Sequence, residues 1–136
     1  MSSFHYKGEE LYVEGVPLSE IACEYGTPTY VYSRDDIETA YRNFDRAFGD
    51  YPHSVCYSVK ANSNIAVLNI LANLGSGFDI VSGGELQRVL KAGGTPSKVV
   101  FSGVGKTREE LIFALKAGIG CFNVESPAEL DLLQCV

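Results

Sequence analysis

Lys60 is the residue of this chain with the clearest chemical potential, because it ends an apolar stretch that begins near Ser54. Alternation along the stretch predicts a strand that directs Cys56, Ser58 and Lys60 to one face. An ammonium group on the inner face of a sheet must pair with an acid or lose its proton. An uncharged lysine amine attacks carbonyl carbons, so Lys60 is a candidate nucleophile. The alternative is a strand-end lysine whose alkyl chain packs while its charge reaches water.

Two carboxylates after Lys60 are further candidates for a functional site. Asp79 lies within the predicted strand Gly77–Val81, and an inward-pointing lysine on the neighbouring strand is the obvious partner for it. The alternative is an aspartate that bonds backbone amides at the start of the strand. Glu85 stands three residues after Ser82, and this capping-box spacing explains the glutamate without any ligand. A role in a functional site is the second interpretation of Glu85.

The segment Gly103-Val-Gly-Lys-Thr107 looks like part of a phosphate-binding loop. That motif requires a glycine five residues before Gly105, and the chain has Val100 there, so the match fails. The segment could still begin a helix that approaches a phosphate or carboxylate, and so could Gly83-Gly84. Simple turn geometry is the other explanation for both glycine pairs.

Composition excludes several classes of function. A net charge of −6 and the lack of any Lys/Arg cluster argue against nucleic-acid and anionic-membrane partners. The four cysteines form no Cys-x-x-Cys pair, and with only His5 and His53 besides they predict no metal site. Scattered cysteines fit the reducing cytoplasm. No apolar run has the length of a signal peptide core or a membrane span.

The apolar pattern becomes regular in the second half of the chain. Predicted strands begin at intervals of 22, 21 and 22 residues, near Cys56, Phe78, Val99 and Cys121. Helical stretches fill the gaps and follow the last strand, at Ile65–Leu74, Glu85–Ala92, Arg108–Ala117 and from Ser126 onward. Such strand–helix units imply parallel strands joined by right-handed crossovers. The fold class is therefore α/β, as an open doubly wound sheet or a (β/α)8 barrel.

Near-constant spacing and the absence of a Gly-x-Gly-x-x-Gly fingerprint favour the barrel. A complete barrel has about eight units, so the four units predicted here form the first half of a TIM-like barrel. Residues 1–25 predict an N-terminal β segment followed by a short helix, and residues 26–136 predict the partial barrel. Within residues 26–136, Thr29–Tyr32 predicts a further strand, and Ser33 predicts the start of a helix.

In both architectures, functional groups gather where strands end and helices begin. The predicted junctions place six residues or segments there: Lys60, Asn62, Ser82–Glu85, Ser102–Lys106, Asn123 and Glu125. This position favours the functional interpretation of Lys60 more than its strand alone does.

Several long motifs resemble those of the diaminopimelate decarboxylases. They are Tyr57-Ser-Val-Lys-Ala-Asn62, Gly75-Ser-Gly-Phe-Asp-Ile-Val-Ser-Gly-Gly-Glu-Leu86, Val99-Val-Phe-Ser-Gly-Val-Gly-Lys-Thr107 and Phe122-Asn-Val-Glu-Ser126. Gly26-Thr-Pro-Thr-Tyr-Val-Tyr-Ser33 agrees as well, so the resemblance covers essentially the whole chain. The family belongs with ornithine and arginine decarboxylases and alanine racemase, whose pyridoxal 5'-phosphate (PLP) lies in a (β/α)8 barrel.

The resemblance implies decarboxylation of meso-2,6-diaminopimelate to L-lysine, in lysine biosynthesis in the cytoplasm. It assigns PLP binding and catalysis to Lys60, and it implies that Asp79 and Glu85 bind near the cofactor and position that lysine. It also implies a homodimer, and it assigns residues 4–16 to a second, β-rich domain. Family members are much longer than 136 residues, so this chain alone is expected to be inactive and to self-associate.

Other functions remain open from the sequence. One is a non-catalytic regulatory or binding homologue that pairs with a full-length relative. Another is a decarboxylase of the same family that acts on ornithine or arginine. A third is a barrel enzyme of another reaction class, in which Lys60 forms an imine with its substrate without PLP.

Overall fold

The computed structural model describes residues 3–136 and divides the chain into two compact units, one ending at Gly49 and the other beginning at Asp50. The boundary that the sequence predicts between residues 25 and 26 lies inside the first unit, and it stays a prediction.

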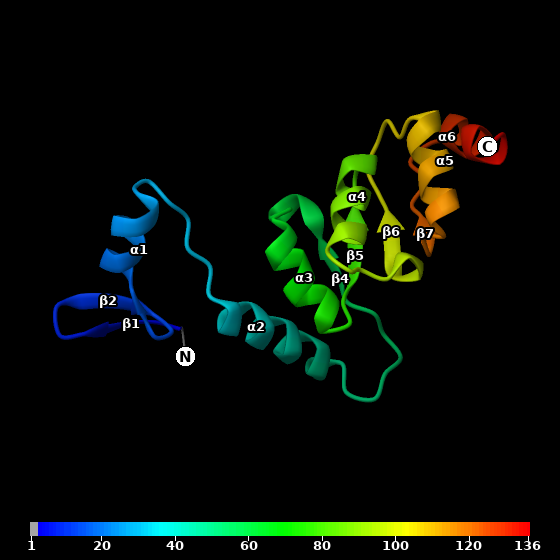
Figure 1. Cartoon of the computed structure of the whole chain (residues 1–136). Coiled ribbons are helices and arrows are strands. Elements are labelled where there is room, and N and C mark those ends of the chain that lie inside the picture. The colour runs from blue at the N-terminus through cyan, green and yellow to red at the C-terminus, as the bar shows by residue number, and fades with distance from the viewer. Residues whose placement is uncertain (1–2) are drawn as a thin grey trace. The chain divides into compact units, whose positions relative to one another are not determined.

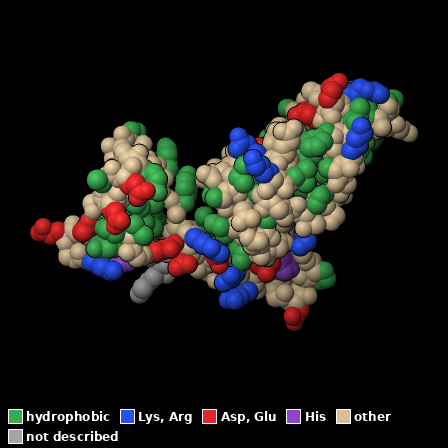
Figure 2. All heavy atoms as spheres, in the orientation of Figure 1, with side chains coloured by type: hydrophobic (Ala, Val, Ile, Leu, Met, Phe, Trp, Pro, Cys, Tyr) green, Lys and Arg blue, Asp and Glu red, His purple; other side chains and the backbone are tan. Residues whose placement is uncertain are grey.

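On the face drawn in Figure 2, lysine and arginine side chains form small separate groups rather than one basic patch. Within residues 3–136, none of the helices has the length and apolar character needed to cross a lipid bilayer.

The first unit is a small antiparallel sheet with two helices (Figure 1). Its elements are β1 (Phe4–Lys7), β2 (Glu10–Val13), β3 (Val16–Pro17), α1 (Leu18–Tyr25) and α2 (Arg34–Ala47). Glu14, in the turn after β2, accepts hydrogen bonds from Ser33 Oγ at 2.8 Å and from the Asp35 backbone N–H at 3.1 Å. These bonds join the sheet to the start of α2, and they lower the pKa of Glu14.

The strand predicted at Thr29–Tyr32 is wrong, because residues 26–33 connect α1 to α2 as irregular backbone. Tyr30 is 90% exposed and Tyr32 is 58% exposed. Aromatic and β-branched residues favour strands only where a neighbouring strand accepts their hydrogen bonds. Neither sheet of the described chain extends to this segment.

The second unit is a parallel sheet of four strands with helices between them (Figure 1). Its strands, in spatial order, are β4 (Cys56–Ser58), β5 (Gly77–Ile80), β6 (Val99–Phe101) and β7 (Cys121–Phe122). Its helices are α3 (Ile65–Asn73), α4 (Gly83–Lys91), α5 (Arg108–Ala117) and α6 (Pro127–Gln134), with short 3-10 turns η1 (Val59–Ala61) and η2 (Pro96–Lys98). The repeating strand–helix prediction is confirmed.

Alternation along the strands separates an apolar face from a polar one. Side chains on the helix-covered face are fully buried, among them Phe78, Ile80, Val99 and Phe101 from the sheet and Leu68, Leu86, Val89 and Leu111 from the helices. The opposite face carries the half-exposed Ser58, Asp79 and Ser102. Strand order follows chain order without reversal, and successive helices α3 to α6 contact one another. The fold is therefore the first half of a (β/α)8 barrel wall rather than a doubly wound sheet, as the sequence predicts.

Candidate active site

Lys60 lies in η1, immediately after β4, and its side chain is exposed. The strand ends at Ser58, two residues before Lys60, so the strand alternation expected from the sequence does not extend to this lysine. Within this turn Val59 is completely inaccessible to solvent, whereas its neighbour Lys60 is exposed. The Tyr57 hydroxyl donates to the Asn62 carbonyl oxygen at 3.4 Å and closes the turn around Lys60.

Among the described residues, Lys60 Nζ has no hydrogen-bond or ion-pair partner. The turn that carries it contacts β5, the strand of Asp79. An unpaired, exposed amine at the carboxyl end of a parallel strand is accessible to a ligand there. Lys60 therefore remains the candidate nucleophile. The reason is that its amine is exposed and, in the described chain, unpaired, whereas the sequence suggests a buried amine that loses its proton.

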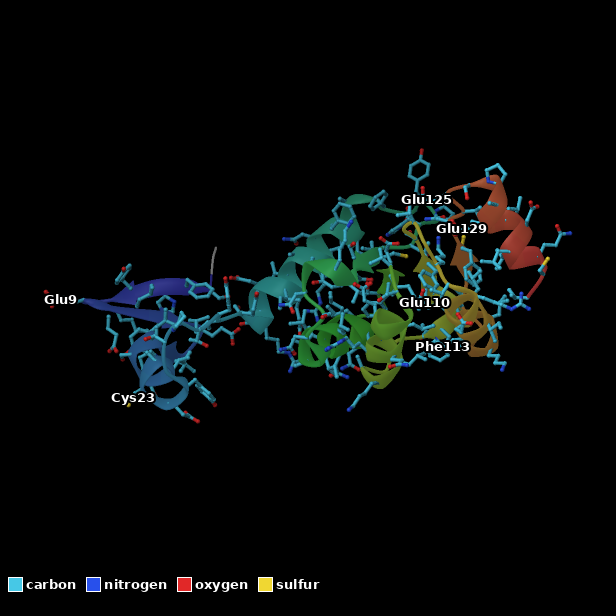
Figure 3. All side chains as sticks on the ribbon, turned by 90° about the horizontal axis from the view of Figure 1, so that it is seen from above. Glu9, Cys23, Glu110, Phe113, Glu125 and Glu129 are labelled. Carbon is cyan, nitrogen blue, oxygen red and sulfur yellow. The ribbon has the colours of Figure 1, made fainter. Side chains whose placement is uncertain are left out.

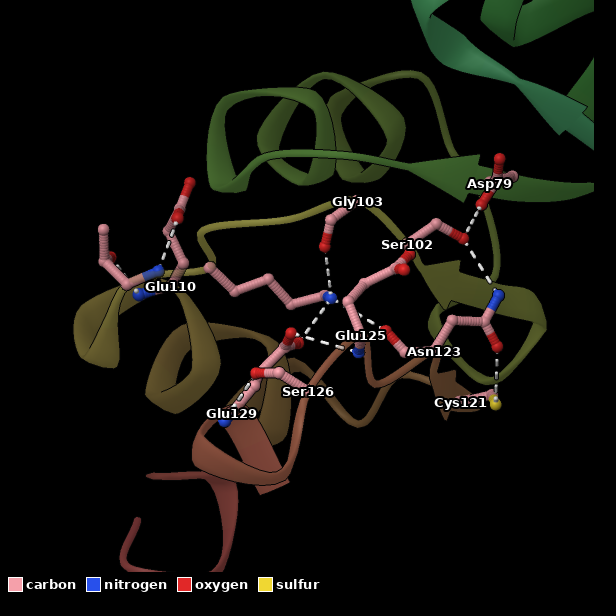
Figure 4. A network of polar contacts seen from close by, with 11 residues as sticks. Asp79, Ser102, Gly103, Glu110, Cys121, Asn123, Glu125, Ser126 and Glu129 are labelled. Atoms are coloured by element: carbon pink, nitrogen blue, oxygen red, sulfur yellow. Dashed lines mark hydrogen bonds and ion pairs between the residues drawn. The ribbon is translucent and has the colours of Figure 1, made fainter. Parts of the chain in front are cut away.

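Asp79 belongs to a group of polar side chains at the strand ends, and Figure 4 shows its contact with Ser102 and the contact of Ser102 with Asn123. Ser58 Oγ, on β4, donates to Asp79 Oδ2 at 3.5 Å, and Ser102 Oγ, after β6, donates to Asp79 Oδ1. Asn123 Nδ2, after β7, donates to Ser102 Oγ at 3.0 Å. The expected lysine partner of Asp79 is thus replaced by two hydroxyl groups. We call these four residues the polar row.

Cys56 also presents a thiol on this face of the sheet. Burial raises the pKa of its thiol, and the charge of Asp79 raises this pKa further. The thiolate is the reactive form of cysteine, so Cys56 is a poor nucleophile at neutral pH.

Glu85 fits the capping interpretation in part, because its carboxylate bonds Val81 rather than the Ser82 backbone N–H that a capping box requires. The Ser82 side chain accepts a hydrogen bond from the Glu85 backbone N–H at 3.2 Å, and Glu85 Oε2 accepts one from the Val81 backbone N–H at 2.8 Å. Glu85 and Asp79 make no hydrogen bond or ion pair with Lys60 in the described chain. The binding role expected for these two carboxylates remains a proposal.

Lys106 is a buried lysine whose contacts the sequence does not reveal. Its side chain is 1% exposed, and Nζ donates to the Gly103 carbonyl at 2.6 Å, the Asn123 carbonyl at 2.8 Å and Glu129 Oε1 at 2.6 Å (Figure 4). The three donors of an ammonium group are therefore all used. This arrangement makes Lys106 a structural residue rather than a free amine.

Two helix-start glutamates bond back to the preceding strand–helix junction. Glu110, at the start of α5, accepts from the Gly83 backbone N–H at 2.8 Å and from the Thr107 backbone N–H at 3.0 Å. Glu129, at the start of α6, bonds Lys106 in the β6–α5 loop. Figure 3 shows Glu110 and Glu129 on neighbouring elements of the second unit. These bonds lower the pKa of both carboxyl groups, through Gly83 for Glu110 and through Lys106 for Glu129.

Comparison with known proteins gives consistent results. Residues 34–136 match a family model described as the pyridoxal-binding domain of pyridoxal-dependent decarboxylases. The chain is 62% identical, over 136 residues, to a diaminopimelate decarboxylase from Pseudomonas aeruginosa. The aligned region covers all of this chain and 33% of that protein. The chain therefore spans about a third of the length of the curated relatives it matches.

Solved structures share the fold as well. A protein from Aquifex aeolicus, AQ1208, superposes with a TM-score of 0.91 at 47% identity, covering 96% of this chain and 32% of that one. A diaminopimelate decarboxylase from M. jannaschii, in complex with L-lysine, superposes with a TM-score of 0.89 at 37% identity, with the same two coverages of 96% and 32%.

Proposed function

The chain belongs to the pyridoxal-dependent decarboxylase family, and from this we propose that it is the amino-terminal part of a diaminopimelate decarboxylase. Such an enzyme converts meso-2,6-diaminopimelate to L-lysine and carbon dioxide, in the lysine biosynthesis of the cytoplasm. The observation that carries the proposal is the 62% identity to a diaminopimelate decarboxylase along the entire chain. The complex of a structural relative with L-lysine, the product of this reaction, supports the same substrate.

The donor set at the strand ends fits the cofactor of this family. Pyridoxal phosphate carries an aldehyde, and Lys60 offers an exposed amine without a partner at the end of β4. Lys60, Asp79 and Glu85 are the residues that would hold it. Lys60 would bind the aldehyde, Asp79 would supply a negative charge on the strand that contacts the turn of Lys60, and Glu85 would keep the start of α4 in place.

When bound, pyridoxal phosphate accepts electrons from the carbon atom that loses carbon dioxide. The other contributions come from the side chains of the chain itself. Lys60 Nζ, with no competing partner, can carry a proton to and from the reacting atoms. The hydroxyl groups of Ser58 and Ser102 bind the two oxygens of Asp79 and restrict its orientation.

A substrate comparison tests the proposal. We expect the complete gene product, with pyridoxal phosphate, to release carbon dioxide from meso-diaminopimelate with a kcat/KM at least tenfold above that for ornithine or arginine. The reason is that the three substrates differ at the end far from the reacting carbon, where polar contacts with the enzyme distinguish them. The 136-residue chain alone should release none. Preference for ornithine or arginine would contradict the substrate assignment. Cofactor binding without turnover of any of the three would indicate a non-catalytic homologue.

The open side of the sheet leads to a proposal about partners. The polar face of the sheet has no helix over it within the second unit, and β4 and β7 each have one edge without a strand partner in the described chain. Such edges pair with other chains. We expect the 136-residue chain to self-associate, whereas the complete protein forms a homodimer. Light scattering tests both, and a monodisperse monomer of the 136-residue chain would contradict the first.

The β1–β3 sheet is assigned, on the same proposal, to a second β-rich domain.

A further inference from the structure

Ser102 and Asn123 connect the end of the sheet to Asp79. Each follows a strand directly, Ser102 after β6 and Asn123 after β7, so both lie at the edge where Lys60 emerges. Asn123 is fixed through its backbone: its N–H donates to the Phe101 carbonyl at 2.9 Å, and its carbonyl accepts from Lys106 Nζ at 2.8 Å. Its side-chain amide therefore has a defined place from which to act.

The hydrogen bonds of the polar row converge on the Asp79 carboxylate. A serine hydroxyl has a single proton, and Asn123 Nδ2 uses an acceptor position of Ser102 Oγ at 3.0 Å. An ionised carboxylate only accepts, so the proton of Ser102 points to Asp79 Oδ1. Ser58 Oγ donates to the other oxygen, Oδ2, at 3.5 Å from the opposite side. Strands on both sides thus hold the carboxylate.

We infer that Ser102 and Asn123 are positioning residues of the cofactor site. They orient the Asp79 carboxylate at the strand ends beside the turn that carries Lys60. The inference rests on the proposed function, because the orientation of Asp79 matters for the reaction only if a cofactor binds to Lys60. Ser102 and Asn123 act through Asp79.

Four variants of the complete gene product test the inference. Ser102→Ala removes the hydroxyl, and Ser102→Thr keeps it. Asn123→Asp preserves the shape but replaces the amide donor with a carboxylate, which competes with Asp79 for the proton of Ser102. Thr107→Ala is the matched control: it deletes a hydroxyl in the same loop that bonds only the start of α5, where it accepts from the Glu110 backbone N–H at 3.2 Å.

The readouts are the absorption spectrum of bound pyridoxal phosphate and the rate at which borohydride traps it on Lys60, located by peptide mass mapping. We expect Ser102→Ala and Asn123→Asp to slow trapping by about tenfold and to change the spectrum, in line with losing one hydrogen bond to a charged acceptor. Ser102→Thr and Thr107→Ala should trap at the wild-type rate. Deuterium exchange in β5 confirms that each variant is folded.

Two results would overturn the inference while leaving the proposed function intact. One is wild-type trapping on Lys60 in both Ser102→Ala and Asn123→Asp. The other is an equal loss in Thr107→Ala, which would mean that any weakening of the loop has the same effect. Absence of an adduct on Lys60 in the wild-type protein would instead refute the proposed function, and the inference with it.

Discussion

Replacing Lys60 by alanine is expected to abolish the pyridoxyl adduct that borohydride traps on the complete gene product. Lys60 Nζ is exposed and without a partner in the described chain, whereas Lys106 Nζ is held by three acceptors and Lys98 Nζ by the Gly75 carbonyl at 2.9 Å. Removing an exposed side chain that makes no hydrogen bond or ion pair in the described chain should change the free energy of unfolding by no more than about 0.5 kcal/mol. Loss of the adduct would then report chemistry rather than misfolding.

Peptide mass mapping after reduction checks this result. Lys91→Ala is a suitable control, because Lys91 is exposed at the end of α4, away from the strand ends. That variant should retain the adduct on Lys60. An adduct found on Lys91 or Lys106 in the wild-type protein would remove Lys60 from the proposed site.

Replacing Lys106 by methionine is expected to destabilise the segment from β6 to α6 by about 3 kcal/mol, the cost of leaving one member of a buried ion pair behind. The variant keeps the alkyl chain but leaves Glu129, whose side chain is only 9% exposed, without its cation. Two backbone carbonyls, of Gly103 and Asn123, also lose their donor. Native-state hydrogen exchange measures the effect locally, as an opening equilibrium raised on the order of a hundredfold.

Lys98→Met is the control for this measurement. Lys98 is exposed and makes one hydrogen bond to the Gly75 carbonyl, so its loss should cost less than about 1 kcal/mol. An equal effect of the two substitutions would mean that the buried charge of Lys106 contributes nothing to the stability of the segment from β6 to α6.

The Lys106–Glu129 pair also makes this stability depend on pH in a defined direction. The hydrogen bond from Lys106 is the main reason that the pKa of Glu129 is below its ordinary value of 4.5 in the folded chain. A carboxyl group with a lowered pKa stabilises the fold fully above its ordinary pKa and loses that contribution as the pH falls through the lowered value. Exchange in α6 should therefore accelerate on acidification below about pH 4.5. Glu129→Gln should flatten this dependence, and a profile unchanged by the substitution would contradict it.

Sequence patterns predicted the architecture of the second unit because its local signals agree with one another. Apolar strands recur at near-equal spacing, and Ser82, Thr107 and Ser126 each cap the helix where the sequence placed it. The bond from the Glu85 backbone N–H to the Ser82 side chain also follows from spacing alone. These features depend on neighbours a few residues apart, which a sequence displays directly.

The contacts that decide the site join residues far apart in the chain. Asp79 bonds Ser58 and Ser102, separated from it by 21 and 23 residues, and sequence alone offered a lysine instead. The Lys106–Glu129 pair also spans 23 residues, between a loop and a helix. Positions at strand ends were predicted, but which side chains meet there depends on strand register and on where a strand gives way to a turn. The end of β4 at Ser58 illustrates the second point.

The back-directed bonds of Glu110 and Glu129 make the strand–helix units of α4 and α5 depend on the units that follow them. Glu110 ties the junction of α4 to α5, and Glu129 ties the loop before α5 to α6. Coupling of this kind acts between nearest neighbours, as in solenoid repeats, so order can spread or be lost one unit at a time. During synthesis on the ribosome, each unit would gain its final hydrogen bonds only when the next has emerged and folded against it.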